Sequence, residues 1–87
     1  MKKKLRLRII TQERIALDTT ADMLIVRCQT GDWGLMPGHE TMSSVLAANS
    51  LLRVLVDGEA EQTVKIYGGL AQIANDVVTI LTNNAEI

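Results

Sequence analysis

Histidine and cysteine are the scarcest residues with metal-binding or catalytic chemistry in this sequence. His39 is the only histidine and Cys28 the only cysteine among 87 residues. Zinc sites draw three or four ligands from the protein, so these two residues cannot assemble one. One cysteine also excludes an internal disulfide, which fits a reducing compartment. We expect no metal site, and we expect Cys28 to be a buried, unreactive thiol.

Two serines and two acids near His39 are the remaining candidates for catalysis. A nucleophile at Ser43 or Ser44, with His39 as its base, would need an orienting group and an oxyanion site, and the spacing suggests neither. Asp32 and Glu40 are separated by a Pro-Gly turn, which does not favour their acting together as general acid and general base. The sequence therefore predicts no catalytic residue.

The adjacent glycines Gly68-Gly69 are the only feature that resembles part of a phosphate-binding loop. Such loops continue into a lysine followed by serine or threonine, and here Leu70 and Ala71 follow instead. We expect no cofactor and no small-molecule substrate. We predict that this chain performs no chemistry by itself.

Length and composition describe one small domain, residues 1–87. Apolar residues make up 47% of the chain, yet it has one Trp, one Tyr and no Phe, so its core must be aliphatic. The formal net charge of −1 argues against nucleic acid as a partner, because nucleic-acid binders carry a basic footprint. No apolar run reaches the length of a membrane span, and we expect a soluble chain without direct membrane insertion.

The first element expected is a strand with an alternating pattern, which Ile10 breaks on the outward side, so part of that side could be covered. Leu5, Leu7 and Ile9 would face the core, while the basic residues at positions 4, 6 and 8 would face outward. The basic face could serve an anionic partner, such as a lipid headgroup or nucleic acid. The alternative is a solvated strand face whose charges block edge-to-edge pairing, and the net charge favours it.

The second strand expected, residues 14–17, is short. Its apolar residues Ile15 and Leu17 would point inward by the same period of two. The polar run at residues 18–20 would loosen this strand, and the pattern would restart at Ala21.

The third strand expected, residues 23–28, is apolar on both faces apart from Arg27. A strand of this kind is usually covered on both sides. Met23 and Ile25 share the second face of this strand, and a domain this small has few residues left to cover that face. Their cover is either another segment of the same chain or a partner protein, and the pattern leaves both open.

Turn signals recur through the second half of the chain. Asp57-Gly58 and Asn75-Asp76 predict two hairpins, and Gly68-Gly69 predicts a bulge or sharp corner. Residues 41–48 are ambiguous between a helical turn and a short strand. The other strands predicted here cover residues 51–56, 63–67, 70–74 and 77–82. Many short strands at this spacing indicate an all-β fold, a small β-sandwich or flattened barrel of mostly antiparallel strands.

Residues 31–40, Gly-Asp-Trp-Gly-Leu-Met-Pro-Gly-His-Glu, form the most unusual stretch of the chain. Three glycines and a proline exclude a helix there. The stretch predicts a turn at Gly31-Asp32, a very short strand at Gly34-Met36, and a second turn at Pro37-Gly38. The bulky residues between them would lie against a core or face a partner.

This stretch resembles the corresponding loop of the epsilon subunit of F-type ATP synthases, which is called delta in mitochondria. Later segments agree in order and spacing: Val64-Lys65-Ile66-Tyr67-Gly68-Gly69, Leu70-Ala71-Gln72-Ile73 and Val78-Thr79-Ile80-Leu81. The resemblance runs from about Leu5 to the last residue, and it covers the N-terminal β domain of the family.

The resemblance implies a non-catalytic rotor subunit of the central stalk, which links the gamma subunit to the membrane c-ring and couples ion translocation to ATP synthesis. It places the chain at the cytoplasmic face of the bacterial inner membrane, as a peripheral part of that complex. It implies a c-ring contact through Asp32 and Trp33. The gamma interface would comprise Met23 and Ile25, together with His39, Met42 and Ser44 and, next to these three, Thr11.

Some of these residues also have local interpretations. Asp32 could cap its own turn, and His39 could be a neutral histidine bonded to the local backbone. The family usually continues Pro-Gly-His with Ala-Pro, whereas this chain has Glu40-Thr41, which leaves the detail of the gamma contact open. The family's helical hairpin would follow Ile87, and we expect a chain that couples without inhibiting hydrolysis by helix extension or sensing ATP.

A free-standing β-sandwich module that binds a peptide or a glycan is the alternative function. It would need a concave pocket lined by aromatic side chains, which two aromatic residues can hardly build. Such a module would purify as a lone soluble species, whereas a rotor subunit would co-purify with its partners.

Overall fold

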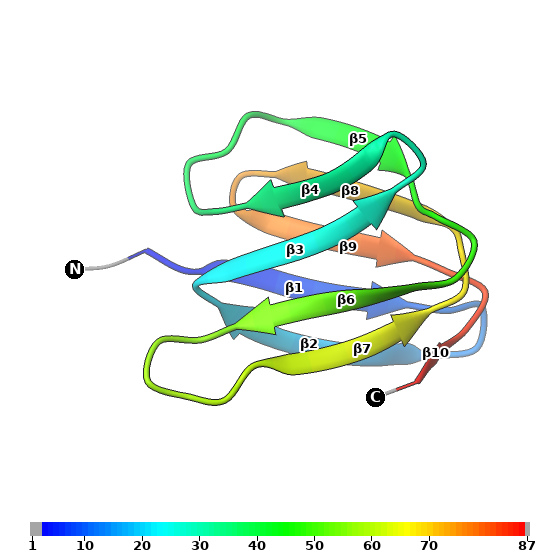
Figure 1. Ribbon diagram of the computed structural model, residues 1–87, viewed down its shortest axis with the longest axis horizontal. Coiled ribbons are helices and arrows are strands. Elements are labelled where there is room, and N and C mark those ends of the chain that lie inside the picture. Colours follow the sequence, from blue (N-terminus) through cyan, green and yellow to red (C-terminus); the bar gives the residue numbers. More distant parts are fainter. Residues whose placement is uncertain (1–2, 87) are drawn as a thin grey trace.

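The computed structural model describes residues 3–86, which form ten strands in two layers (Figure 1). The strands are β1 (Leu5–Ile10), β2 (Ile15–Ala21), β3 (Met23–Cys28), β4 (Gly31–Leu35), β5 (Met42–Val45), β6 (Ser50–Leu55), β7 (Gln62–Ile66), β8 (Leu70–Ala74), β9 (Val77–Leu81) and β10 (Ala85–Glu86). The predicted all-β sandwich is confirmed. Within these residues no helix is long and apolar enough to cross a membrane.

The two layers are five-stranded sheets. The β1 sheet has the strand order β2-β1-β9-β8-β5, and the β3 sheet has the order β10-β7-β6-β3-β4. The paired strands are antiparallel except β1 and β9, which run parallel. The first strand of the chain therefore lies inside its sheet, against the last long strand (Figure 1).

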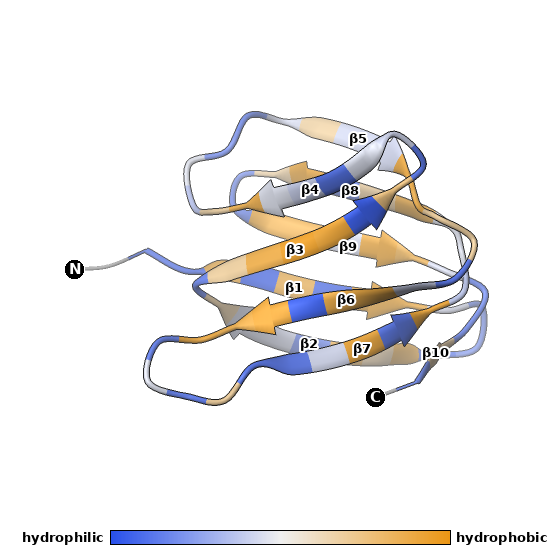
Figure 2. Cartoon of the chain, in the orientation of Figure 1, coloured by the Kyte–Doolittle hydropathy of each residue, from blue (hydrophilic) through white to orange (hydrophobic). Residues whose placement is uncertain are grey.

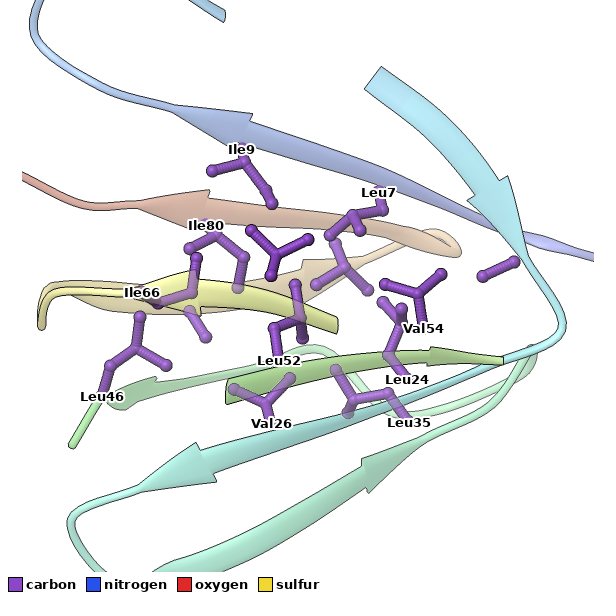
Figure 3. Packing of buried hydrophobic residues seen from close by; sticks show 14 of the residues in the cluster. Leu7, Ile9, Leu24, Val26, Leu35, Leu46, Leu52, Val54, Ile66 and Ile80 are labelled. Carbon is purple, nitrogen blue, oxygen red and sulfur yellow. The ribbon is translucent and has the colours of Figure 1, made fainter. Parts of the chain in front are cut away.

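The core between the sheets is aliphatic, as the composition predicts. Leu5, Leu7 and Ile9 are fully buried, which confirms the alternation expected for β1. Leu24 and Leu52 face them from the other sheet, and Figure 3 shows the side chains of both layers interdigitating. The alternating hydropathy of β1, β6 and β7 is visible in Figure 2. Strand period thus fixes which side of each sheet is apolar.

Strand β2 differs from its prediction in two respects. Ile9 pairs with Leu17 but Ile10 pairs with Ile15, so the register shifts within β2. This bulge turns Ile15 outward with Ile10, and the prediction that Ile15 points inward is wrong. The polar residues 18–20 do not loosen the strand either, because Asp18 pairs with the basic side of β1 and keeps the ladder continuous.

The turn predicted at Gly31-Asp32 lies two residues earlier. Cys28 pairs with Gly31, so Gln29 and Thr30 form the turn and both predicted turn residues belong to β4. Gly31, directly after the turn, has φ +127°, a backbone conformation that favours glycine. The types of residue in this stretch indicate that a turn is present, but they do not determine which two residues form it.

Gly34 is a strand residue and not the start of the short strand predicted at 34–36. A Cβ at this position would lie 3.3 Å from the Met23 Cε, so the glycine makes room for that side chain. The Pro37-Gly38 turn is confirmed, with Gly38 at φ +88°. The Gly38 N–H donates to the Asp76 Oδ1 at 2.7 Å, which ties this turn to the β8–β9 hairpin.

The remaining turns follow their predictions. Asn75 and Asp76 both have positive φ, the conformation of a type I′ hairpin, and Gly58 has φ +78°. Gly68-Gly69 form the sharp corner between β7 and β8; a Cβ on Gly69 would overlap the carbonyl of Leu81. Residues 42–45 resolve as strand β5, not as a helical turn.

Candidate partner interface

An exposed apolar row crosses the outward side of the β1 sheet. Register partners connect Val45 to Leu70, Leu70 to Leu81, Leu81 to Ile10 and Ile10 to Ile15. We call these five residues the apolar row. Exposed fractions are 49% for Val45, 37% for Leu70, 45% for Leu81 and 51% for Ile15, while Ile10 is half-buried. Four of the large apolar side chains exposed on the domain are therefore in register.

A polar row runs parallel to the apolar row, two residues along each strand except β2, where the bulge makes the offset three. Its members are Ser43, Gln72, Thr79, Arg8 and Asp18, again connected by register. The sheet thus exposes polar side chains in one row and apolar side chains in the next. Contiguous exposed apolar surface with a polar border is typical of protein–protein interfaces.

A hollow of about 330 Å3 adjoins the middle of the apolar row, at Leu81 and Ile10. It is lined by the end of β1, the corner glycine and the end of β9, including Ile10, Thr11, Gly69 and Leu81. The hydroxyl of Thr11 donates to the Arg14 carbonyl oxygen at 3.2 Å and so shapes the β1–β2 turn. A partner seated on the row would meet this hollow as well.

The basic face of β1 is paired with acids from β2. Arg6 donates from Nε to the Asp18 Oδ1 at 3.1 Å and from Nη2 to Oδ2 at 2.9 Å. These bonds hold the pKa of the Asp18 carboxyl below its usual value, and they raise the pKa of Arg6. Lys4 lies 3.5 Å from the Asp22 carboxylate. Arg6 engages both oxygens of Asp18, and the Arg8 Nε lies 3.9 Å from Oδ2, so two basic side chains share one acid, as on a solvated strand face.

Asp32 and Trp33, the predicted c-ring pair, point to opposite sides of β4. Asp32 is the register partner of Arg27 on the outward side, and it accepts a hydrogen bond from the Arg27 Nε at 3.1 Å. Trp33 is the register partner of the buried Val26 and packs partly against the core. Asp32 therefore bonds across the strands and does not cap its own turn.

His39 lies over the edge of Trp33. The two rings are 5.8 Å apart and nearly perpendicular, at 79°. The His39 Nδ1 is 2.9 Å from the Glu40 carbonyl oxygen, which can only accept, so Nδ1 carries the hydrogen. This backbone bond agrees with the local interpretation of His39.

The six residues predicted for the gamma interface do not form one surface. Thr11 follows the end of β1, which two strands separate from β5, and it lies towards the end of the sheet opposite Met42, so it is not next to that group. Met42 and Ser44 lie at an open edge, where they line a groove of about 150 Å3 together with Trp33. Met23 and Ile25 lie on the outward side of the other sheet.

Met23 and Ile25 are half-buried, and their own chain supplies cover. Met23 lies over Gly34 on the neighbouring strand, and Ile25 pairs with Arg53 of β6. Neither side chain is among the strongly exposed apolar residues of the domain. The interpretation of these two residues as surface awaiting a partner is therefore weaker than the one for the apolar row.

The family model for the ATP synthase delta/epsilon chain β-sandwich domain matches residues 4–87. The chain belongs to this family. Its named relatives include the ATP synthase epsilon chains of Synechococcus sp. (strain WH7803) and Prochlorococcus marinus (strain NATL1A), each 35% identical over 83 residues. That alignment covers 95% of this chain and 60% of each relative.

Two solved structures share the fold of this family member. A chain in the Euglena gracilis mitochondrial ATP synthase, a structure of OSCP, F1 and c-ring, superposes with a TM-score of 0.85 and 27% identity, covering 94% of this chain and 52% of its own length. A chain in the structure of the Tetrahymena thermophila mitochondrial ATP synthase central stalk and c-ring superposes with a TM-score of 0.75 at 13% identity. The superposition covers 97% of this chain and 66% of the Tetrahymena chain.

Sequence reasoning missed the apolar row on this family member. Its signal is present, since Ile10, Leu70 and Leu81 interrupt the polar side of alternating strands. Strand pairing between residues far apart in sequence is needed to align them, and no local pattern supplies it. Within residues 3–86, no group of three or more potential ligands is placed to hold a metal ion.

Proposed function

We propose that this chain, as a single β-sandwich domain, is a non-catalytic rotor subunit of the central stalk of an F-type ATP synthase. It links the gamma subunit to the c-ring and couples ion translocation to ATP synthesis. Membership of the delta/epsilon family supports the role. The observation that carries the docking mode is the apolar row, an exposed surface across a whole sheet. A free-standing module is not favoured, because among residues 3–86 the hollow beside that row has no aromatic side chain in its lining.

The gamma subunit covers the apolar row in this proposal. Each half-exposed leucine or isoleucine that becomes fully buried contributes roughly 1 kcal/mol. The interface continues over the β5 edge, where His39, Met42 and Ser44 lie, and into the hollow beside Thr11. A partner seated there does not reach Met23 and Ile25, so the proposed interface leaves them out.

The c-ring is contacted by the end of the sandwich that carries the β3–β4 hairpin. Asp32 lies just after its turn, its side chain is 58% exposed, and it forms an ion pair with Arg27. An exposed ion pair costs little to rearrange, so Asp32 can exchange Arg27 for polar or basic groups of the ring. Trp33 supports this contact from within, because it braces β4 against the core.

The proposed location is the cytoplasmic face of the bacterial inner membrane. The chain is attached there through other subunits of the complex and not by insertion. The bacterial source of the named relatives supports this location.

Reconstitution tests the role. ATP synthase from the same source, stripped of its own epsilon subunit and placed in lipid vesicles, is mixed with the 87-residue chain. We expect the chain to bind and to restore ATP synthesis driven by an ion gradient. A variant with Leu70→Glu and Leu81→Glu, which charges the row, is the matched control and should do neither. Binding by both proteins, or by neither, would contradict the proposed docking.

A further inference from the structure

The outward side of the β3 sheet holds a second recess, on the face opposite the apolar row. Its volume is about 360 Å3, within the range of ligand pockets. We call it the basic hollow. Ile25 and Leu51 supply its apolar side chains. The charged residues that line it are Arg27, Arg53, Lys65 and Asp32. Glu61 lies outside the lining but bonds Arg53, so three positive charges face two negative ones.

Leu51 is the apolar anchor of the basic hollow. It is 55% exposed although it lies on β6, an inner strand of the sheet. Its register partner on β7 is Lys65, whose Nζ lies 5.2 Å from the centroid of the Tyr67 ring. Arg27 approaches the hollow from β3. An exposed leucine therefore has a cation on each of the two neighbouring strands.

The two arginines keep donors available for a further acceptor. Arg27 bonds Asp32 through Nε alone, at 3.1 Å. Arg53 directs both Nε and Nη2 to the same oxygen of Glu61, at 3.1 and 2.7 Å. A guanidinium carries five N–H donors, so most of them have no partner among residues 3–86. Both pairs are solvent-exposed, with side-chain exposures of 63% and 58% for the first, and such pairs rearrange at little cost.

We propose that the basic hollow binds a short acidic segment of a partner protein, in which carboxylates flank an apolar side chain. The carboxylates accept hydrogen bonds from Arg27 and Arg53, while the apolar side chain packs on Ile25 and Leu51. Arginine forks match carboxylates in a bidentate geometry. Asp32 at the rim disfavours dense polyanions such as nucleic acid.

This site is separate from the proposed gamma contact. The hollow and the apolar row lie on opposite outward faces of the sandwich, so both can be occupied at once. Failure of the gamma contact therefore leaves this proposal intact, and each has its own measurement. Arg27 and Asp32 are shared with the proposed c-ring contact, so an acidic segment in the hollow and the ring would compete for this pair.

Titration with a defined peptide tests the inference. The probe is acetyl-Glu-Leu-Glu-Leu-Glu-amide, and its neutral control is acetyl-Gln-Leu-Gln-Leu-Gln-amide. We expect the acidic peptide alone to shift the backbone amide NMR signals of Ile25, Leu51 and Lys65, with an effect that weakens as salt is added. No shift at peptide concentrations up to about 10 mM, or equal shifts with the neutral peptide, would overturn the proposal.

Variants separate the hollow from general charge attraction. The double substitution Arg27→Gln and Arg53→Gln should weaken binding of the acidic peptide at least about tenfold. Arg6→Gln, which removes a cation from the other face, is the matched control and should leave binding unchanged. Vesicles of phosphatidylglycerol are the second probe. If they bind with the same dependence on Arg27 and Arg53 while the peptide does not bind, the occupant is a lipid surface and the proposal is wrong.

Discussion

The two outward faces of the sandwich expose apolar side chains in different surroundings. On the β1 sheet, the apolar row contains no charge, and the charged side chains of that face, such as Arg6, Arg8 and Asp18, lie outside it. On the β3 sheet, Leu51 and Ile25 are interleaved with ion pairs such as Arg27–Asp32. One fold thus offers a continuous apolar contact on one face and a charge-selective contact on the other.

The difference has a physical consequence for binding. Burial of apolar area is non-directional and insensitive to moderate salt, so the row suits a permanent contact with a large, complementary surface. Charged contacts contribute more to specificity and association rate than to affinity, and salt screens them. The β3 sheet is accordingly suited to a weaker and more selective partner.

The largest effect is expected from disturbing the corner that sets the row in register. Gly69 has φ +116°, and an added Cβ would overlap the Leu81 carbonyl and lie 2.9 Å from the Thr82 Cα. Gly69→Ala should reduce the free energy of unfolding by at least about 3 kcal/mol, measured by urea denaturation. Gly58→Ala is the matched control, since φ is also positive there but the space is open. Gly58→Ala should lower the free energy of unfolding by only about 1 kcal/mol. Equal losses in the two variants would mean that the backbone moves to relieve the overlap between the new Cβ and the Leu81 carbonyl.

The next effect separates the faces by their affinity for the gamma subunit. Leu81→Glu places a charge in the centre of the row and should weaken gamma binding at least about 100-fold, because central apolar anchors dominate interface energetics. Calorimetric titration gives the affinity. Leu51→Glu makes the same change on the other face and should leave the affinity within about twofold. A larger loss from Leu51→Glu than from Leu81→Glu would reverse the assignment of the faces.

A smaller effect is expected from the ion pair on the β3 sheet. Arg27→Gln combined with Asp32→Asn removes both exposed charges of the pair. The midpoint of thermal unfolding should change by no more than about 2 °C, because exposed pairs contribute little to stability. Leu24→Ala, beneath the same sheet, should lower it far more, since that side chain is fully buried. A fall of comparable size in the double variant would show that the pair is part of the fold and not an available binding group.

The smallest effect concerns pH and the basic side of the β1 sheet. Hydrogen bonds from Arg6 lower the pKa of Asp18 in the folded protein from its usual 3.8. The ionised carboxylate therefore stabilises the fold above that value, and this contribution is lost as pH falls through the lowered folded-state pKa. Asp18→Asn should flatten the stability profile in this acid range and leave its slope near neutral pH unchanged. An unchanged acid slope would show that the pairing contributes nothing.

The fold was largely predictable from the sequence because strand alternation and turn chemistry are local. Leu5, Leu7 and Ile9 follow the period of two, and Asn75-Asp76 adopts the turn its residue types favour. The bulge that exposes Ile15 was not predictable, because it arises from pairing between β1 and β2.

The candidate interface was predictable only in part. The resemblance located the β3–β4 hairpin and the β5 edge, but it could not show that Asp32 and Trp33 point to opposite sides of one strand. The apolar row needs residues from five strands in register, among them the parallel pair of β1 and β9. Such long-range pairing is a property of the folded sheet, and no short stretch of the sequence specifies it.

Protection of a single introduced cysteine from alkylation shows directly which outward face of the sandwich the gamma subunit covers. Cys28 is 4% exposed, so alkylation of the native thiol contributes little background. We compare the alkylation rates of Leu81→Cys and Leu51→Cys, each with and without the gamma subunit. We expect gamma to slow alkylation at position 81 by more than about tenfold and to leave alkylation at position 51 unaffected. Protection at position 51 with free reaction at position 81 would contradict it.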